Sequence, residues 1–212
     1  MVDLTHRRLY LCTADRPDLG EFLVACMRGG VDLVQLRDKD LTARQLVARG
    51  GEAAAVCADF DVPFILNDRP DLALACGADG VHVGQDDTPP SVARQILGPD
   101  GVIGLSTHAP EEWNLAGREP VDYLSAGPVN ATPTKPGRAG TGVGYLSYAA
   151  TTPPGPVLPW FVTGGVTPET IPEMVANGAR RFVVVRYLTE SDEPQSAARR
   201  LRVAIDGAAG WD

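Results

Sequence analysis

An alternation that runs along the whole chain constrains the fold most: short apolar, β-branched segments are followed by longer amphipathic ones, eight times over. The apolar segments predict strands at 8–12, 31–36, 63–66, 80–83, 102–105, 122–126, 159–162 and 181–185. The amphipathic segments predict helices at 18–28, 41–58, 70–76, 90–97, from 110 onward, 145–150, 168–177 and 192–205. Eight such pairs, at about 25 residues each, predict a small (β/α)8 barrel.

An open, doubly wound sheet is the alternative that the same alternation allows. Its polar loops would gather at one switch point, whereas polar or glycine-bearing residues here follow seven of the eight predicted strands. Barrel enzymes carry their sites at the C-terminal ends of the strands, so this pattern favours the barrel. We therefore predict one α/β domain over residues 1–212, with a short mobile N-terminus and a frayed tail after Gly207.

The composition narrows the expected partners and compartment. The 27 acidic and 19 basic residues give a net charge of −8, which argues against a general binder of nucleic acid or acidic membranes. No apolar run approaches the roughly twenty residues that span a bilayer, and no signal-like segment precedes the first strand, so we expect a cytoplasmic protein. The four cysteines lack metal-site spacing and are expected to be small buried side chains.

The segment 131–144 is predicted to be a functional loop. It holds two prolines, four glycines and three threonines beside Lys135 and Arg138, a composition unsuited to a regular helix or strand. Its hydroxyl and basic groups are suited to binding an anion. The chain contains two lysines, Lys39 and Lys135, and both fall among the candidate site residues.

Polar side chains also follow the second predicted strand. Gln35, Arg37 and Lys39 would point the same way if the strand continues through them, which brings two cations and an amide together. A surface ion pair with Asp38 or Asp40 is the alternative for these cations.

Carboxylates follow the third and fourth predicted strands. Asn67 or Asp68, and likewise Asp87, could cap the helix that comes next. The two aspartates could instead converge on a cation, because Mg²⁺ takes one or two protein carboxylates and completes its octahedron with water and phosphate oxygens. We favour Asp68 and Asp87 as Mg²⁺ ligands.

The remaining strand ends carry a histidine and a phosphate-binding pattern. For His108, a hydrogen-bonding role at a helix entrance and a role in proton transfer both stay open. His82 lies between two valines and is expected to be a core residue with satisfied hydrogen bonds. Gly164-Gly165 and Arg186 follow the seventh and eighth strands, between which barrels often bind phosphate.

Taken together and in order, these segments resemble the thiamine-phosphate synthase family over nearly the whole chain. The segments that carry the resemblance are 35–39, 67–68, 80–85, 106–108, 127–128 with 132–137, and 164–165. The resemblance implies an enzyme that joins 4-amino-5-hydroxymethyl-2-methylpyrimidine diphosphate to a thiazole phosphate. It also implies that diphosphate is released with the help of Mg²⁺.

The resemblance further implies a role for each matching residue. The pyrimidine diphosphate would be held by Gln35, Leu36, Arg37, Asp38, Lys39, Asn67, Ser106 and Lys135. The thiazole phosphate would be held by Thr132, Pro133, Thr134, Gly165, Val185 and Arg186. The catalytic groups would be Arg37, Lys39, Ser106 and Lys135, and the metal ligands Asp68 and Asp87. The expected partners are these small substrates, and a homo-oligomer stays open.

The chain departs from the family pattern at two places. Asn130-Ala131 stands where an aromatic residue and a proline are common, and Arg186 stands where serine is common. Two alternatives are a related thiazole tautomerase, which would depend on His108, and a non-catalytic phosphate-binding barrel. A tautomerase gives no reason to keep the cations Arg37 and Lys39 together with a pair of aspartates, so the synthase is favoured.

Lys135 generates the first testable prediction. Its attraction to diphosphate would offset part of the entropy of ordering the segment 131–144, at roughly 1 to 2 kcal/mol per residue fixed. We expect Lys135→Ala to lower turnover strongly and to leave the melting temperature nearly unchanged. We also expect the segment to gain protection from hydrogen exchange when magnesium diphosphate is added. Full activity of Lys135→Ala, with equal protection in both states, would contradict this prediction.

Overall fold

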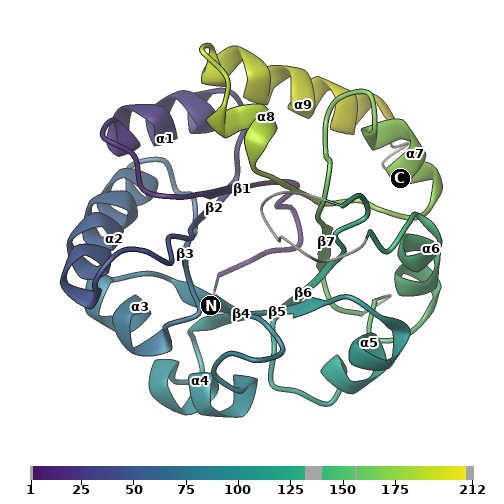
Figure 1. Cartoon of the computed structure of the whole chain (residues 1–212), viewed down its shortest axis with the longest axis horizontal. Helices are drawn as coiled ribbons and strands as arrows, with labels where there is room; N and C mark the ends of the chain where they lie inside the picture. Colours follow the sequence, from purple (N-terminus) through teal and green to yellow (C-terminus); the bar gives the residue numbers. More distant parts are fainter. Residues whose placement is uncertain (1, 132–139, 156, 209–212) are drawn as a thin grey trace.

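The computed structural model describes residues 2–131, 140–155 and 157–208, and in it eight parallel strands close into a barrel in sequence order (Figure 1). The strands are β1 (Leu9–Thr13), β2 (Leu33–Leu36), β3 (Phe64–Asn67), β4 (Gly80–Val83), β5 (Val102–Thr107), β6 (Tyr123–Ala126), β7 (Trp160–Val162) and β8 (Phe182–Val184). The barrel closes where β1 pairs with β8, with Leu9 opposite Phe182. The predicted (β/α)8 barrel is confirmed, and the open sheet is excluded.

Helices surround the barrel and cover the outer face of its strands (Figure 1). They are α1 (Leu19–Arg28), α2 (Ala43–Ala58), α3 (Pro70–Cys76), α4 (Pro90–Leu97), α5 (Pro110–Ala116), α6 (Gly144–Thr151), α7 (Ile171–Ala176), α8 (Arg186–Thr189) and α9 (Pro194–Ala208). No helix in the described ranges combines the length and apolarity needed to cross a bilayer. The four cysteines are buried thiols, as predicted.

Strand alternation divides the core into two layers. Outward-facing residues such as Leu11 and Val34 pack against the helices in one cluster. Inward-facing residues form a second cluster that contains Tyr10, Tyr123 and Phe161. The interior of the barrel is therefore filled by side chains, as in other barrels of this size.

Several boundaries differ from the predictions, and two of these shifts and one unpredicted helix lie next to the predicted site. The helix predicted from Pro168 begins at Ile171, because the Thr170 hydroxyl accepts a hydrogen bond from the Thr167 amide at 2.9 Å and holds a turn there. Strand β5 continues to Thr107, since its last residues pair with β6, so Ser106 lies within the strand rather than after it. The four-residue helix α8 was not predicted, because one turn has no detectable periodicity.

Three aspartates fasten neighbouring strands together at the N-terminal end of the barrel. Asp79, just before β4, donates its backbone N–H to the Phe64 carbonyl and accepts the Phe64 N–H on its carboxylate, both at 2.8 Å. Asp122 does the same with Ile103, and Asp32 with Leu9. We call these two-way contacts of Asp32, Asp79 and Asp122 the aspartate clasps. They lie at the opposite end of the strands from the predicted site.

The clasp at Asp79 yields a stability prediction. Asp79→Ala leaves the Phe64 amide at the start of β3 without its carboxylate acceptor, which should cost about 1 to 3 kcal/mol of unfolding free energy. Asp79→Asn keeps an acceptor oxygen and should lose less. Urea unfolding followed by circular dichroism measures both variants. Equal stability of Asp79→Ala and the wild type would show that the clasp contributes nothing.

Candidate active site

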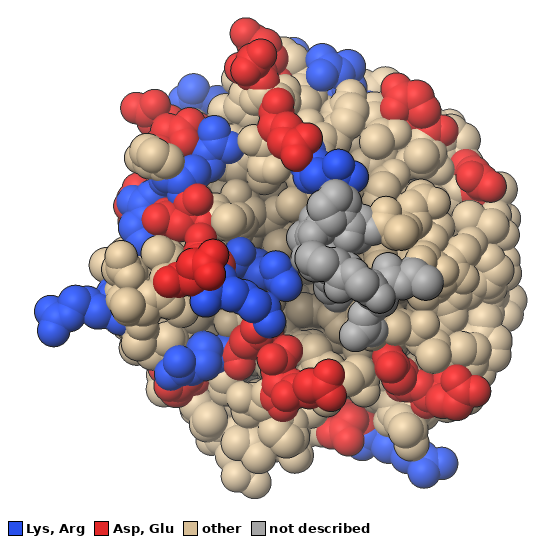
Figure 2. All heavy atoms as spheres, viewed as in Figure 1, with Lys and Arg blue, Asp and Glu red and all other residues tan. Residues whose placement is uncertain are grey.

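A pocket of about 630 Å³ lies at the C-terminal ends of the strands. Figure 2 shows this face hollowed at its centre, with Lys and Arg side chains beside the hollow and acidic side chains next to them. Ten of the residues predicted for the site line the pocket. They are Gln35, Arg37, Lys39, Asn67, Asp68, Asp87, Ser106, Gly165, Val185 and Arg186. Residues far apart in the sequence thus meet in one cavity.

The alternation predicted for the end of β2 is present. Gln35, Arg37 and Lys39 all line the pocket, whereas the two residues between them do not. Leu36 is buried in the layer between strands and helices. The Asp38 carboxylate accepts backbone N–H groups of Asp15 and Asp40, at 3.1 and 3.0 Å. The side chains of Leu36 and Asp38 therefore support the strand end, and neither lines the pocket. Thr132, Pro133, Thr134 and Lys135 lie outside the described residues.

Lys39, Asp68 and Asp87 form a charged cluster at one wall of the pocket. Lys39 Nζ lies 3.1 Å from Asp68 Oδ2, so Lys39 pairs with Asp68 rather than with Asp38 or Asp40. Burial raises the pKa of the Asp68 carboxyl, the neighbouring Asp87 carboxyl raises it further, and Lys39 lowers it. Asp68 also has a φ of 62°, a left-handed conformation that few residues other than glycine adopt. The two carboxylates are thus held together despite their repulsion.

The capping alternative for these carboxylates is wrong. Neither α3 nor α4 has a side-chain cap hydrogen bond, and the N-cap positions are taken by Arg69 and Pro89. Asp87 instead accepts the backbone N–H of Gly84 at 2.8 Å, which holds the turn after β4 and directs the carboxylate toward Asp68.

The pair of carboxylates is chemically suited to a divalent cation, which would neutralise their repulsion. The described residues contain no group of three or more His, Cys, Asp or Glu side chains that could hold a metal. Asp68 and Asp87 would therefore form an open site that takes further oxygens from water or from a phosphate, as Mg²⁺ sites commonly do.

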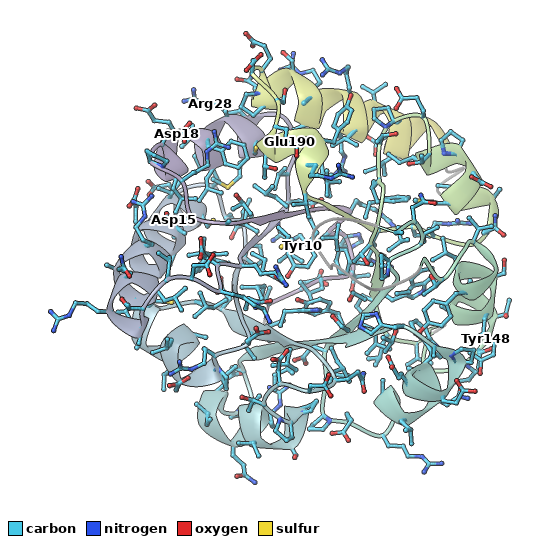
Figure 3. All side chains as sticks on the ribbon, viewed as in Figure 1. Tyr10, Asp15, Asp18, Arg28, Tyr148 and Glu190 are labelled. Carbon is cyan, nitrogen blue, oxygen red and sulfur yellow. The ribbon has the colours of Figure 1, made fainter. Side chains whose placement is uncertain are left out.

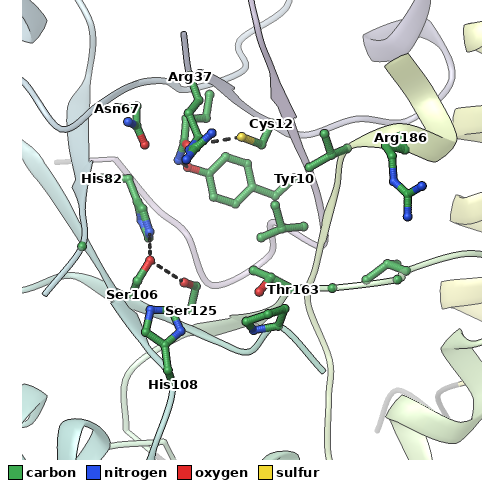
Figure 4. Close-up of a pocket in the computed structure, with 18 of the residues that line it drawn as sticks. Tyr10, Cys12, Arg37, Asn67, His82, Ser106, His108, Ser125, Thr163 and Arg186 are labelled. Atoms are coloured by element: carbon green, nitrogen blue, oxygen red, sulfur yellow. Dashed lines mark hydrogen bonds between the residues drawn. The ribbon is translucent and has the colours of Figure 1, made fainter. Parts of the chain in front are cut away.

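Two arginines face the pocket from other walls. Figure 4 shows Arg37 near the end of β2 and Arg186 at the start of α8, with the Tyr10 ring between them in this view. Neither arginine forms an ion pair with another described side chain. Both guanidinium groups are thus available to an anionic ligand.

The loop after β7 brings bare backbone to the same side of the pocket as Arg186. Gly164 and Gly165 have φ values of 96° and 75°, which favour glycine. A Cβ at Gly164 would lie 2.6 Å from the Pro128 side chain, and one at Gly165 would lie 2.7 Å from Asn130 Nδ2. Asn130, one of the departures from the family pattern, therefore packs directly against the glycine loop.

His82 and His108 lie in different environments. His82 is buried with both ring nitrogens hydrogen-bonded, as predicted for a core residue, yet it also lines the pocket. The backbone N–H of His108 donates to Glu112 Oε2 at 2.8 Å, and its ring Nδ1 contacts the Gly127 carbonyl oxygen. The hydrogen-bonding role at a helix entrance is therefore present for His108, whose ring also faces the pocket.

Several pocket residues were missed from the sequence. They are Tyr10, Cys12, Gln85, Asp86, Ser125, Thr163 and Glu190, among others. Tyr10 lies at the centre of the barrel (Figure 3). The available signal was polar side chains at alternate positions within apolar strands, as at Cys12 in β1 and Ser125 in β6.

The charged cluster yields a prediction about stability in the absence of metal. The folded-state pKa of Asp68 lies above its ordinary value of 3.8, so the resulting stabilisation is present below that value and is lost as the pH rises through the raised pKa. Asp87→Asn removes the repelling charge and should lower the Asp68 pKa, with a gain of roughly 0.5–1 kcal/mol in unfolding free energy at pH 7. NMR titration and urea unfolding measure these changes.

Asp100→Asn is the matched control, because Asp100 is exposed, lies outside the pocket and loses the same charge. It should change neither the Asp68 pKa nor the stability. A loss of stability in Asp87→Asn alone would show that its bond to Gly84 outweighs the repulsion.

The sequence matches the family profile described as thiamine monophosphate synthase over residues 9–188. It is 46% identical to a thiamine-phosphate synthase of Mycobacterium bovis, over 97% of each chain. It is also 46% identical to a thiamine-phosphate synthase of Thermus thermophilus, over 95% of this chain and 98% of that one.

A solved structure agrees with these sequence matches. Thiamine phosphate pyrophosphorylase from Pyrococcus furiosus superposes with a TM-score of 0.86 and 28% identity, covering 96% of this chain and 98% of that one. The two proteins thus have the same barrel fold along nearly their full length. The profile, the sequence relatives and the pocket at the strand ends lead to one conclusion: the chain belongs to the thiamine-phosphate synthase family of transferases.

Proposed function

We propose that this protein joins 4-amino-5-hydroxymethyl-2-methylpyrimidine diphosphate to a thiazole phosphate, giving thiamine phosphate and diphosphate. One observation carries the proposal: a single pocket has two separate places for an anion. Arg37, Lys39 and the Asp68–Asp87 pair are suited to a diphosphate with its cation. Arg186 and the loop at Gly164-Gly165 are suited to a phosphate on another wall. A reaction between two phosphorylated molecules needs such an arrangement.

The chemistry that the residues support is a dissociative substitution. Diphosphate leaves from a benzylic-type carbon, and the electron-rich aminopyrimidine stabilises the cation that remains. The side chains must then neutralise the leaving group and position the thiazole nitrogen, which forms the new bond to carbon. No covalent enzyme intermediate is required.

Leaving-group charge is balanced by Arg37 and Lys39, with Lys135 as a third cation expected from the sequence. Asp68 and Asp87 would hold Mg²⁺, which supplies charge neutralisation at the diphosphate oxygens when bound. Lys39 already pairs with Asp68 at 3.1 Å, so the carboxylate that would bind the cation also orients the ammonium group.

Gln35 and Ser106 are proposed to hold the pyrimidine ring at the floor of the pocket. Both are buried polar side chains, 4% exposed each, and both have hydrogen-bond partners that restrict their orientation. A fixed ring places its reactive carbon between the two anion-binding walls, which is the positioning that such a reaction requires.

The tautomerase alternative is not favoured, because the named relatives above are synthases. The reaction test is to mix both substrates and Mg²⁺ with the protein and to measure thiamine phosphate and diphosphate. We expect the two products in equal amounts, and no turnover when EDTA removes the metal. Binding of both substrates without any product would support the non-catalytic barrel instead.

The proposal places the reaction in the cytoplasm. Support comes from the four buried cysteines, which remain thiols as is usual in a reducing compartment.

Arg186 yields a prediction that separates the two substrates. If its guanidinium binds the thiazole phosphate, Arg186→Ser should raise KM for that substrate by about tenfold, the scale of a lost charge-assisted hydrogen bond. KM for the pyrimidine diphosphate should stay within twofold of the wild-type value. Steady-state kinetics with each substrate varied in turn measures both constants.

Arg199→Ser is the matched control, since Arg199 is exposed on α9 and its loss changes the net charge equally. It should leave both constants unchanged. An effect of Arg186→Ser on the pyrimidine diphosphate alone would contradict the assignment of Arg186.

A further inference from the structure

Polar side chains form a continuous hydrogen-bonded chain across the floor of the pocket. Gln35 Nε2 donates to the Tyr10 hydroxyl at 2.6 Å, and that hydroxyl lies 2.9 Å from the Tyr123 hydroxyl. The Tyr123 hydroxyl lies 3.0 Å from His82 Nδ1, and His82 Nε2 lies 2.9 Å from Ser106 Oγ. The chain therefore joins Gln35 on β2 to Ser106 on β5, the two residues proposed to hold the pyrimidine ring.

The packing inside the barrel accommodates the rings of this hydrogen-bonded chain. Gly104 on β5 lies beside both rings, and a Cβ there would come 2.1 Å from Tyr123 Cζ and 2.4 Å from His82 Nδ1. Phe161 packs edge-on against both tyrosines, with ring centroids 5.3 Å from Tyr10 and 5.5 Å from Tyr123. The absence of a side chain at Gly104 and the packing of Phe161 thus hold the rings in place.

Counting hydrogens determines the direction of the chain. Burial raises the pKa of both phenols, so each hydroxyl stays protonated and contributes one hydrogen. The Tyr10 oxygen accepts from Gln35, and the hydrogen of Tyr10 itself is paired within this hydrogen-bonded chain when it is donated to Tyr123. The Tyr123 hydrogen then goes to His82 Nδ1, which leaves the imidazole proton on Nε2 to be donated to Ser106.

The Gln35 amide sets this direction at its start. Its Oε1 accepts the Cys12 thiol at 3.3 Å, which leaves Nε2 as the atom that faces Tyr10. Turning the amide over would place an N–H against sulfur, a weak acceptor, and would reverse every hydrogen bond as far as Ser106.

We propose that Tyr10, Tyr123 and His82 are positioning residues that fix the hydrogen-bonding roles of Gln35 and Ser106 together. Ser106 Oγ accepts from His82, and Ser125 makes a longer contact with it at 3.4 Å (Figure 4). The Ser106 hydrogen is then left to point into the pocket. Ser106 thus takes a hydrogen-bond acceptor of the ligand, such as a ring nitrogen of a pyrimidine, and a ligand with a donor at that place is rejected.

The first test is the tautomer of His82, measured by long-range ¹H–¹⁵N NMR on protein labelled with ¹⁵N-histidine at neutral pH. His6→Gln and His108→Gln variants identify the other two signals. We expect the proton on Nε2 and an acceptor Nδ1. A proton on Nδ1, or on both nitrogens, would overturn the proposed direction.

The second test removes one hydroxyl group from the hydrogen-bonded chain. Tyr123→Phe keeps the ring and its packing but removes the hydrogen bond between Tyr123 and His82 Nδ1, so the hydrogen-bonded chain no longer fixes the orientation of Ser106. We expect calorimetry to show about tenfold weaker binding of the pyrimidine diphosphate with Mg²⁺, the scale of a buried group left unsatisfied. Inorganic diphosphate with Mg²⁺ should bind within twofold of wild type, because it occupies only the charged wall. Equal weakening of both ligands would indicate a merely structural role and would overturn the proposal.

Tyr148→Phe is the matched control. Tyr148 lies at the outer edge of the barrel (Figure 3), where its hydroxyl donates to Asn114 Oδ1 at 2.9 Å. This variant also loses one tyrosine hydrogen bond and should bind both ligands as the wild type does.

The inference rests on the proposed function for the identity of its ligand, and the two can fail separately. If the wild type binds the pyrimidine diphosphate without forming thiamine phosphate, the proposed function fails while the tautomer and binding comparisons still hold. If the wild type turns over and Tyr123→Phe binds the pyrimidine diphosphate equally well, the inference alone is wrong.

Discussion

Closure of the barrel makes each strand present one row of side chains to the helices and the other to a narrow axis, and both the fold and the site depend on this division. Apolar side chains such as Leu33, Ile65 and Val102 fill the axis together with Phe161, and Leu4 packs with them. Polar inward-facing side chains such as Gln35, His82 and Ser106 lie nearer the C-terminal ends of their strands. The pocket is thus the unfilled end of the same interior that stabilises the barrel.

The sequence predicted the features that depend on local pattern. Eight alternations were enough for the barrel, because the residue period of a buried strand differs from that of an amphipathic helix. The same period of two predicted that Gln35, Arg37 and Lys39 share a face, and it explains why Leu36 and Asp38 do not join them. The positions of the predicted strand ends were therefore enough to predict which residues form the charged wall of the pocket.

Features that depend on three-dimensional register could not be predicted in this way. Tyr10 reads as one more apolar strand residue, and its place in the floor appears only when β1 and β6 face each other across the axis. His82 was correctly expected to be buried, but its partner Ser106 is 24 residues away. The capping role considered for Asp87 is wrong, because its carboxylate accepts the backbone N–H of Gly84 within the turn after β4.

The aspartate clasps join β1 to β2, β3 to β4 and β5 to β6, so three quarters of the barrel is assembled from fastened strand pairs. The last pair differs: Arg181 precedes β8 in place of an aspartate, and β7 and β8 share a single registered position, Val162 opposite Phe182. Gly164-Gly165 lie in the loop that follows β7, and Arg186 begins the helix that follows β8. A phosphate held by both would therefore connect the loop after β7 to the helix after β8, across a strand pair with a single registered position. Substrate binding would then add a contact between β7 and β8 that no aspartate clasp supplies.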